Sequence, residues 1–298
     1  MIETWHNFWR RKLRTTLTIL GIVVGTLALT VMGAMSEKIN LLVDGALKYY
    51  GTRVVVQAGT TVPGQFLGAV LSAGIAEDVR AIPDVAAAFP TVYTLYQEQA
   101  DEVPAASFGF PPLVIGVDAR RFDYEEDRYP VVLSSGRLFV PGERGVALVG
   151  VDLAKYKGVG LGDALTVRGR DLEIVGIMER TLTARDNVAF VPLADGQEFL
   201  AEMLPPSFSA DPSALATEIE VYPDPLDRAD AVARAINREV EGVRALAPRE
   251  IERQISQSLI IFNVIIISSA VIAMVVGGLS ILNTMVVAVS ERPREIGI

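Results

Sequence analysis

The sequence predicts an α+β domain of two subdomains, inserted between two transmembrane α-helices that continue beyond the membrane as a helical stalk. Three observations support this fold class. Two long runs of the 298-residue chain, one near each end, contain no charged residue. Short β-rich segments alternate with turn residues between these runs. A mean hydropathy of +0.36, with 50% hydrophobic residues, exceeds that of an ordinary soluble protein of this length.

The first uncharged run, residues 17–35, predicts a transmembrane helix. As a helix it spans roughly 28 Å, close to the thickness of the hydrocarbon core of a bilayer. A cleaved signal peptide is the alternative, because basic residues precede the run and small residues lie near Gly33. However, the run is longer than the apolar region of a signal peptide, and a helical pattern follows it over residues 36–50.

The second uncharged run, residues 259–289, predicts another transmembrane helix. It is roughly 46 Å long as a helix, so it tilts or extends past the bilayer. A buried core helix is the alternative, but a run of this length is too long for one. Residues 249–258, which follow Pro248, lead into it without a helix breaker. Residues 36–50 keep a helical pattern and end at Gly51, so both spans are expected to have stalk extensions.

The residues before the first span predict the orientation of the chain. Residues 1–16 are expected to form an interfacial amphipathic helix, with Trp5 and Trp9 on its apolar side. These aromatic residues anchor the span or contact a cytoplasmic partner. Four basic residues precede the span and only Lys38 lies close behind it, so the positive-inside rule places the N-terminus in the cytoplasm. The chain is then a multi-pass protein of the inner or plasma membrane, with both termini cytoplasmic.

With this orientation, residues 36–258 form an extracytoplasmic domain of acidic character. Of the chain's 27 basic and 36 acidic residues, 21 and 33 lie in this segment. Such a surface excludes nucleic acid as a partner and leaves membrane lipid as a partner of the spans alone. It serves solubility or binds cations. Cysteine is absent and the single histidine, His6, is cytoplasmic, so disulfides and any outer metal or nucleophile site using these residues are excluded.

Within the outer domain, hydrophobic alternation and turn residues predict eight strands and four helices. The expected strands are Arg53–Gln57, Val92–Gln97, Leu113–Val117, Val146–Val149, Ala164–Arg168, Leu172–Ile177, Val188–Val191 and Glu218–Tyr222. The expected helices are Ile75–Ala81, Val151–Tyr156, Leu193–Ala201 and Asp227–Glu241, the last capped by Asp227 and ended by Gly242. Segments 104–112 and 204–212 are the expected linkers.

One acidic segment is the only candidate for a cation-binding or catalytic site in the outer domain. Asp123, Glu125, Glu126 and Asp127 could bind a cation or serve acid–base chemistry. We interpret the segment as a solvated acidic loop.

The C-terminal residues, Glu-Arg-Pro-Arg-Glu-Ile-Gly-Ile over 291–298, resemble the cytoplasmic segment that follows the second transmembrane helix in MacB/FtsX-type ABC transporter permeases. Segments 41–45, 51–54 and 135–193 are similar, in order and spacing, to the periplasmic core domain of MacB. The resemblance covers essentially the whole chain. Family members carry two further transmembrane helices after this motif. This sequence is expected to lack them, either because it is a fragment or because the missing part is encoded elsewhere.

The resemblance implies a dimeric permease that works with a separate cytoplasmic ABC ATPase, whose ATP-driven closure moves the stalk and the outer domain. No phosphate-binding loop motif is present, so the chain is not expected to be an enzyme or to hold a cofactor; ATP and Mg belong to the partner. The expected contacts with the ATPase lie in segment 290–298: Glu291, Arg292, Arg294, Glu295, Ile296 and Gly297. These charges otherwise serve only as topology determinants.

Small residues predict where helices pack against one another in the membrane. Gly21 and Gly25 allow close approach on the first span. The expected small-residue face of the second span consists of Ser269, Ala273, Gly277, Ser280, Thr284 and Ala288.

Two functions remain open for the outer domain. It acts in export or extraction of a substrate, with a membrane-fusion protein as an expected partner, or it acts as an FtsX-like sensor or regulator of another extracytoplasmic protein without transport. The sequence names no substrate.

Overall fold

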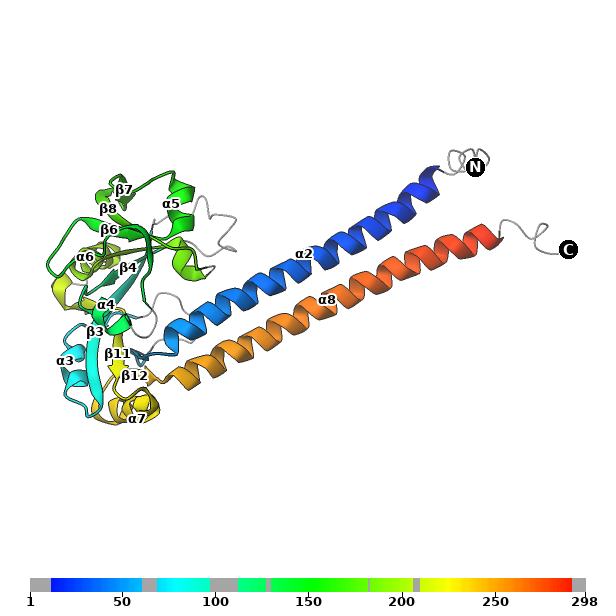
Figure 1. Ribbon diagram of the computed structural model, residues 1–298. Coiled ribbons are helices and arrows are strands. Elements are labelled where there is room, and N and C mark those ends of the chain that lie inside the picture. The colour runs from blue at the N-terminus through cyan, green and yellow to red at the C-terminus, as the bar shows by residue number, and fades with distance from the viewer. Residues whose placement is uncertain are drawn as a thin grey trace. The chain divides into compact units, whose positions relative to one another are not determined.

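The computed structural model describes residues 12–60, 69–96, 112–126, 130–181, 183–205 and 210–290 (Figure 1). The chain divides into two compact units. One contains residues 1–40 and 255–298, and the other contains residues 41–254. The predicted interfacial helix lies outside the described residues except for residues 12–16, and most of the expected linker 104–112 lies outside them too.

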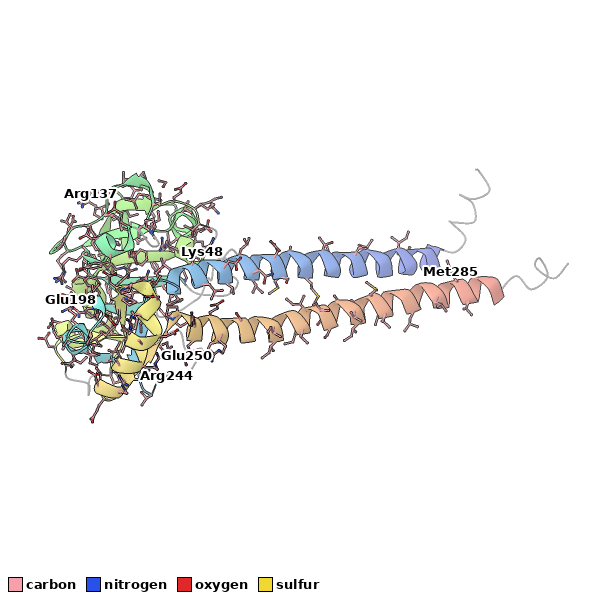
Figure 2. The ribbon with its side chains drawn as sticks, turned by 60° about the horizontal axis from the view of Figure 1, so that its bottom comes forward. Lys48, Arg137, Glu198, Arg244, Glu250 and Met285 are labelled. Carbon is pink, nitrogen blue, oxygen red and sulfur yellow. The ribbon has the colours of Figure 1, made fainter. Side chains whose placement is uncertain are left out.

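Two long helices account for the described part of the first unit. α2 runs from Lys12 to Tyr50 and α8 from Pro248 to Ser290, so each predicted span and its stalk extension form one unbroken helix. Large apolar side chains are exposed along both helices, among them Leu27 at 61% and Met285 at 65% (Figure 2). Judged over the residues that the structure describes, neither helix has the length and hydropathy of a membrane span.

The second unit is built on a mixed sheet, in which the described residues form ten strands in the order β12-β1-β11-β3-β4-β9-β6-β8-β5, with β7 paired to β8. Neighbours are antiparallel except for the parallel pairs β4–β9 and β6–β8. The strands of this sheet are β1 Val54–Ala58, β3 Val85–Leu95, β4 Leu113–Val117, β5 Leu133–Gly136, β6 Val146–Val149, β7 Ala164–Val167, β8 Arg170–Met178, β9 Val188–Pro192, β11 Glu218–Pro223 and β12 Val243–Leu246. β2 (Leu71–Ser72) and β10 (Leu215–Ala216) form a separate pair.

Five shorter helices accompany the sheet in the described part of this unit: α3 Ile75–Arg80, α4 Arg121–Glu125, α5 Val151–Lys157, α6 Leu193–Met203 and α7 Ala229–Glu239. The predicted cap of α7 is wrong. Asp227 lies in a 3-10 turn, Leu226–Arg228, and the residue at the cap position, Arg228, makes no side-chain capping bond. The helix ends before Gly242, which instead adopts a positive φ of 75° in the turn to β12.

The sheet contains two lobes, each with its own core. We define the first lobe as β12, β1, β11 and β3 with α3 and α7, and the second as β4 to β9 with α5 and α6. In the first lobe, Val54, Ile219 and Ile236 belong to one apolar cluster. In the second, alternate residues of β6 and β9 belong to two clusters, so this half of the sheet is buried on both faces. The two expected subdomains therefore share one sheet, because β3 and β4 pair across the boundary.

The outer edge of the first lobe is closed by a side chain. On β12, the backbone N–H and C=O of Ala245 both bond to the carboxamide of Asn237 on α7, at 2.7 and 2.9 Å. These bonds occupy the groups through which an edge strand pairs with another chain.

Candidate functional site where the long helices join the domain

Three residues separate the end of α2 from the start of the sheet. The N–H of Gly51 donates to the carbonyl of Leu47 at 2.7 Å, and a Cβ on Gly51 would lie 2.7 Å from the same oxygen. Glycine therefore suits the last turn of the helix, as the sequence predicted. Arg53 follows and β1 starts at Val54, so the chain passes from the helix into the sheet within a few residues.

α8 starts directly after β12. The carbonyl of Ala247 accepts from the N–H groups of Glu250 and Ile251, and Pro248 occupies the first helical position, where its missing N–H is not needed. Two ion pairs hold the first turn. Arg249 pairs with Asp230 of α7 at 3.2 Å. Arg244 of β12 pairs with Glu250 at 2.8 Å, and both are labelled in Figure 2.

The two helices are thus joined to neighbouring strands. β1 and β12 pair antiparallel, from Val55 opposite Leu246 to Ala58 opposite Val243. Sliding one helix along the other would break this ladder, so movement of the helices reaches the sheet edge as a movement of both strands together. A cavity of about 280 Å³ beside this junction is lined by Leu47, Tyr50, Gly51, Leu226, Asp227, Ala229, Asp230, Pro248, Arg249 and Glu252.

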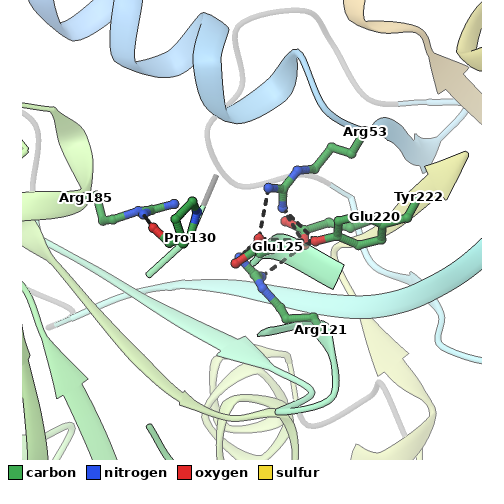
Figure 3. Close-up of polar contacts among 7 residues, drawn as sticks. All are labelled: Arg53, Arg121, Glu125, Pro130, Arg185, Glu220 and Tyr222. Atoms are coloured by element: carbon green, nitrogen blue, oxygen red, sulfur yellow. Dashed lines mark hydrogen bonds and ion pairs between the residues drawn. The ribbon is translucent and has the colours of Figure 1, made fainter. Parts of the chain in front are cut away.

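A buried ionic network lies on the face of β1 and β11 opposite the apolar cluster of the first lobe (Figure 3). Arg53 pairs with Glu125 of α4 at 2.9 Å and with Glu220 of β11 at 3.1 Å. Arg121 pairs with the same two carboxylates, each at 3.0 Å. The four side chains are 0–1% exposed, and their charges balance.

Tyr222 completes this network. Its hydroxyl accepts from Arg53 at 3.0 Å and donates to Glu125 at 3.2 Å. Burial, together with the negative charge of Glu220, holds the pKa of Tyr222 well above its ordinary value. The phenol is therefore neutral and stays a hydrogen-bond donor. The network joins three segments that are far apart in the sequence: the start of β1, α4 and β11. β1 precedes β11 by more than 150 residues.

Glu218 lies two residues before Glu220 on the same face of β11, and its carboxyl group is also buried. Burial, with a further contribution from the negative charge of Glu220, raises the pKa of Glu218 to about 8. The neighbouring side chains of Gln57 and Tyr93 and the positive charge of Arg53 partly offset this rise in the pKa. Glu218 is therefore largely protonated at neutral pH.

Close packing also joins α2 to the second lobe. Gly45 is buried, and an ideal Cβ built on it would lie 2.1 Å from Cγ2 and 2.6 Å from Cβ of Thr183. Thr183 belongs to the segment between β8 and β9, which we call the β8–β9 loop (residues 179–187). Only glycine at position 45 permits this approach.

The chemistry of this site is structural. The described residues contain no group of three or more His, Cys, Asp or Glu side chains arranged to hold a metal ion. Arginine–carboxylate pairs that are fully buried fix geometry, because removing one partner leaves an uncompensated charge. The site therefore ties the ends of the two helices to α4 and to both lobes.

The predicted site residues fall elsewhere. Glu291 to Gly297 lie outside the described residues. Gly21 and Gly25 lie in α2. Ser269, Ala273 and Gly277 lie half-buried on α8, and Ser280 and Thr284 lie further along the same helix. Their packing role stays a prediction.

The interpretation of the acidic segment as a solvated loop is wrong for Glu125. This residue is buried and ends α4, whereas Asp123 and Glu126 are exposed as expected and Asp127 lies outside the described residues. Helical spacing from Arg121 was the available signal, since residues four apart on a helix face each other. The glutamates of β11 alternate with apolar residues, which is typical of a solvated face, so no local pattern predicts their burial.

Comparison with known proteins identifies the domain. The profile of the family described as MacB-like periplasmic core domain matches residues 15–250. The chain belongs to this family. The resemblance inferred from the C-terminal motif and the outer segments is therefore confirmed, and the MacB-like domain includes most of α2 as well as the sheet.

Relatives of the chain include three named membrane-transport proteins. The macrolide export ATP-binding/permease protein MacB of Rhodopseudomonas palustris is 27% identical over 96% of this chain and 44% of its own length. The pyoverdine export ATP-binding/permease protein PvdT of Pseudomonas aeruginosa is 24% identical over 99% and 44%. The ABC transporter permease YknZ of Bacillus subtilis is 24% identical over 96% and 73%. The chain thus spans less than half the length of MacB and PvdT.

Among solved structures, the periplasmic region of MacB from Actinobacillus actinomycetemcomitans has a TM-score of 0.46 and 11% identity, and covers 69% of this chain and 92% of its own. The extracellular domain of YknZ from Gram-positive bacteria has a TM-score of 0.44 and 11% identity, over 65% and 99%.

Proposed function

We propose that this chain is the permease subunit of a MacB-type ABC transporter, which passes ATP-driven movement of a separate cytoplasmic ATPase to an extracytoplasmic domain for export or extraction of a substrate. One observation carries the proposal: a MacB-like domain whose two long helices connect through at most three residues to neighbouring strands of its sheet. The names of the relatives, two of which denote export proteins, agree with it.

Both helices are proposed to cross the membrane at residues 17–35 and 259–289. The proposal rests on the complete sequence, in which neither run carries a charge. Exposed apolar side chains recur at four-residue intervals on α2, at Ile19, Val23, Leu27 and Val31. In water each would cost about 1.5–3 kcal/mol relative to burial, so lipid or a neighbouring helix is the environment that fits them.

The ATPase is proposed to bind at segment 290–298, which the orientation predicted from the basic N-terminus places in the cytoplasm. Charges of both signs at the end of a helix form directional ion pairs with a partner. ATP and Mg would be held by that partner. Because ABC permeases act in pairs, a second permease copy is proposed to complete the transporter, with a membrane-fusion protein as a further partner outside.

Movement is proposed to enter the domain at the β1–β12 edge. The network of Arg53 then carries it to α4, because its buried ion pairs cannot part without a large energetic cost. The first lobe would therefore move as one body with the ends of both helices.

Two measurements test the proposal. The first is the topology of the full chain in cells, which cysteine labelling reports cleanly because the chain has no cysteine of its own. Lys155→Cys should react with a membrane-impermeant maleimide added outside, whereas a cysteine placed after Ile298 should react only after the membrane is permeabilised. Equal labelling of both positions would contradict two spans.

The second measurement is co-purification with a MacB-type ATPase from detergent-solubilised membranes, with and without residues 290–298. Binding that requires these residues supports both the permease assignment and the coupling segment. Binding that survives their removal refutes the coupling segment alone. If neither form binds an ATPase, the chain is either a fragment that needs the two further helices of the family or a sensor that acts without an ATPase. Restoring those helices decides which, and the proposal fails if binding is still absent.

A further inference from the structure

α2 is attached to the domain at two places that lead to different lobes. Its covalent attachment, through Gly51 and Arg53, leads to β1 and the first lobe. Its contact at Gly45 reaches Thr183 of the β8–β9 loop, which belongs to the second lobe. Gly45 lies about 7.5 Å along the helix axis from the end of α2 at Tyr50, at 1.5 Å per residue. A tilt of α2 about its attachment to β1 therefore displaces Gly45 and acts on Thr183.

Hydrogen bonds of polar side chains hold the β8–β9 loop in place, so it can pass such a displacement on. Asp186 is 3% exposed, and its carboxylate accepts from the N–H and the hydroxyl of Thr181 at 2.8 and 2.7 Å. The hydroxyl of Thr181 bonds in turn to that of Thr183 at 2.7 Å. Arg185 donates to the carbonyl of Pro130 at 2.8 Å (Figure 3). The loop is thus closed by its own polar side chains.

A second glycine fixes the loop to the second lobe. A Cβ on Gly150, at the start of α5, would lie 2.4 Å from the carbonyl oxygen of Asp186 and 2.5 Å from that of Arg185. The loop backbone therefore lies directly against α5, whose Leu153 is part of the core of this lobe. Because the loop and α5 are closely packed, a displacement of Thr183 is passed directly to that core.

We propose that the contact between Gly45 and Thr183 transmits movement of α2 to the second lobe, so that the two lobes move relative to one another when the helices move. This inference rests on the proposed function, which supplies the movement. The backbone of α2 at Gly45 and the β-branched side chain of Thr183 meet without space between them, which distinguishes this contact from ordinary packing through longer side chains.

The contact itself is tested first, without any ATPase. In the full chain, which has no cysteine, Gly45→Cys combined with Thr183→Cys should form a disulfide under mild oxidation. The 2.6 Å between the built Cβ and that of Thr183 is about 1 Å shorter than a disulfide needs, so the two backbones must move apart by about that distance when the crosslink forms. Gly33→Cys with Thr183→Cys is the control and should stay unlinked. Absence of the first crosslink would overturn the inference and leave the proposed function untouched.

Transmission is tested in lipid nanodiscs with the MacB-type ATPase. Lys155→Cys on α5 and Arg238→Cys on α7, both exposed, carry spin labels that report the distance between the lobes. We expect ATP to change this distance in the parent chain. Thr183→Gly opens the contact and should abolish the change, whereas adding Gly45→Ala to Thr183→Gly fills the gap and should restore it. Gly33→Ala, with nothing within 4 Å, should leave the change intact.

The possible outcomes distinguish a failure of this inference from a failure of the proposed function. An ATP-dependent distance that persists in Thr183→Gly overturns the inference alone. A parent chain whose inter-lobe distance ignores ATP, although the ATPase is bound, also overturns the inference, because no movement reaches the second lobe. A chain that binds no ATPase overturns the proposed function with it. Unchanged circular dichroism spectra of the Thr183→Gly and Gly45→Ala/Thr183→Gly variants show that the fold is intact in each case.

Discussion

Replacing Arg53 with methionine removes one cation from the buried network and leaves its two carboxylates with Arg121 alone. The network then holds an uncompensated negative charge at a place that is 0–1% exposed. Breaking a buried ion pair in this way costs about 3–5 kcal/mol. In a domain of about 200 residues, 1 kcal/mol shifts the melting temperature by about 2–4 °C. Arg53→Met should therefore lower Tm by roughly 6–20 °C.

Circular dichroism of the full chain in detergent, followed during heating, measures this shift. Arg249→Met is the matched control, because its partner Asp230 is a surface carboxylate and the arginine is 81% exposed, so at most about 1 kcal/mol is at stake. Adding Glu125→Gln to Arg53→Met restores charge balance and should recover part of the loss. If Arg53→Met melts no lower than Arg249→Met, the argument that the network fixes the junction is refuted.

Three further outcomes follow from the structure. Folded Glu218 keeps a proton that the unfolded chain releases near pH 4.5, so the free energy of unfolding should fall as pH rises from about 4.5 to 8 and then level off. Glu218→Gln should flatten this part of a plot of Tm against pH. An unchanged slope in that variant would mean that another group titrates. Asn237→Ala should cost about 1–3 kcal/mol and speed hydrogen exchange at the Ala245 amide, while distant amides of the second lobe keep their rates. Phe190→Ala, at 1% exposure, should cost about 3–5 kcal/mol, and a loss below 1 kcal/mol would mean that the cluster repacks around the gap.

The sequence predicts the regular elements well where their pattern is local. All eight expected strands and all four expected short helices are present, because each carries its own apolar alternation or helical spacing. The strands that were not predicted are short and lie mostly at edges. β5, for example, is four residues long, includes two serines and Gly136, and is largely exposed. Such a segment forms a strand because β8 offers it a partner, which no local pattern reveals.

The candidate site could not be predicted in the same way. Arg53 and Glu220 meet because β1 and β11 pair with Val55 opposite Glu220, a register that depends on more than 150 intervening residues. Gly45 was noted as part of a family-like segment, but the close approach of Thr183 depends on the path of the β8–β9 loop. Long-range register and loop path are tertiary properties, and the residues involved have ordinary local propensities.

The adjacency of β1 and β12 also bears on how such proteins diversify. The polypeptide leaves the helices and returns to them through two strands that are hydrogen-bonded neighbours, about 5 Å apart. The segment from Val54 to Leu246 is therefore an insertion whose two ends lie close together, which is the arrangement that domain insertion tolerates. A different module could replace it without altering the two long helices, provided that its own termini also lie on paired strands.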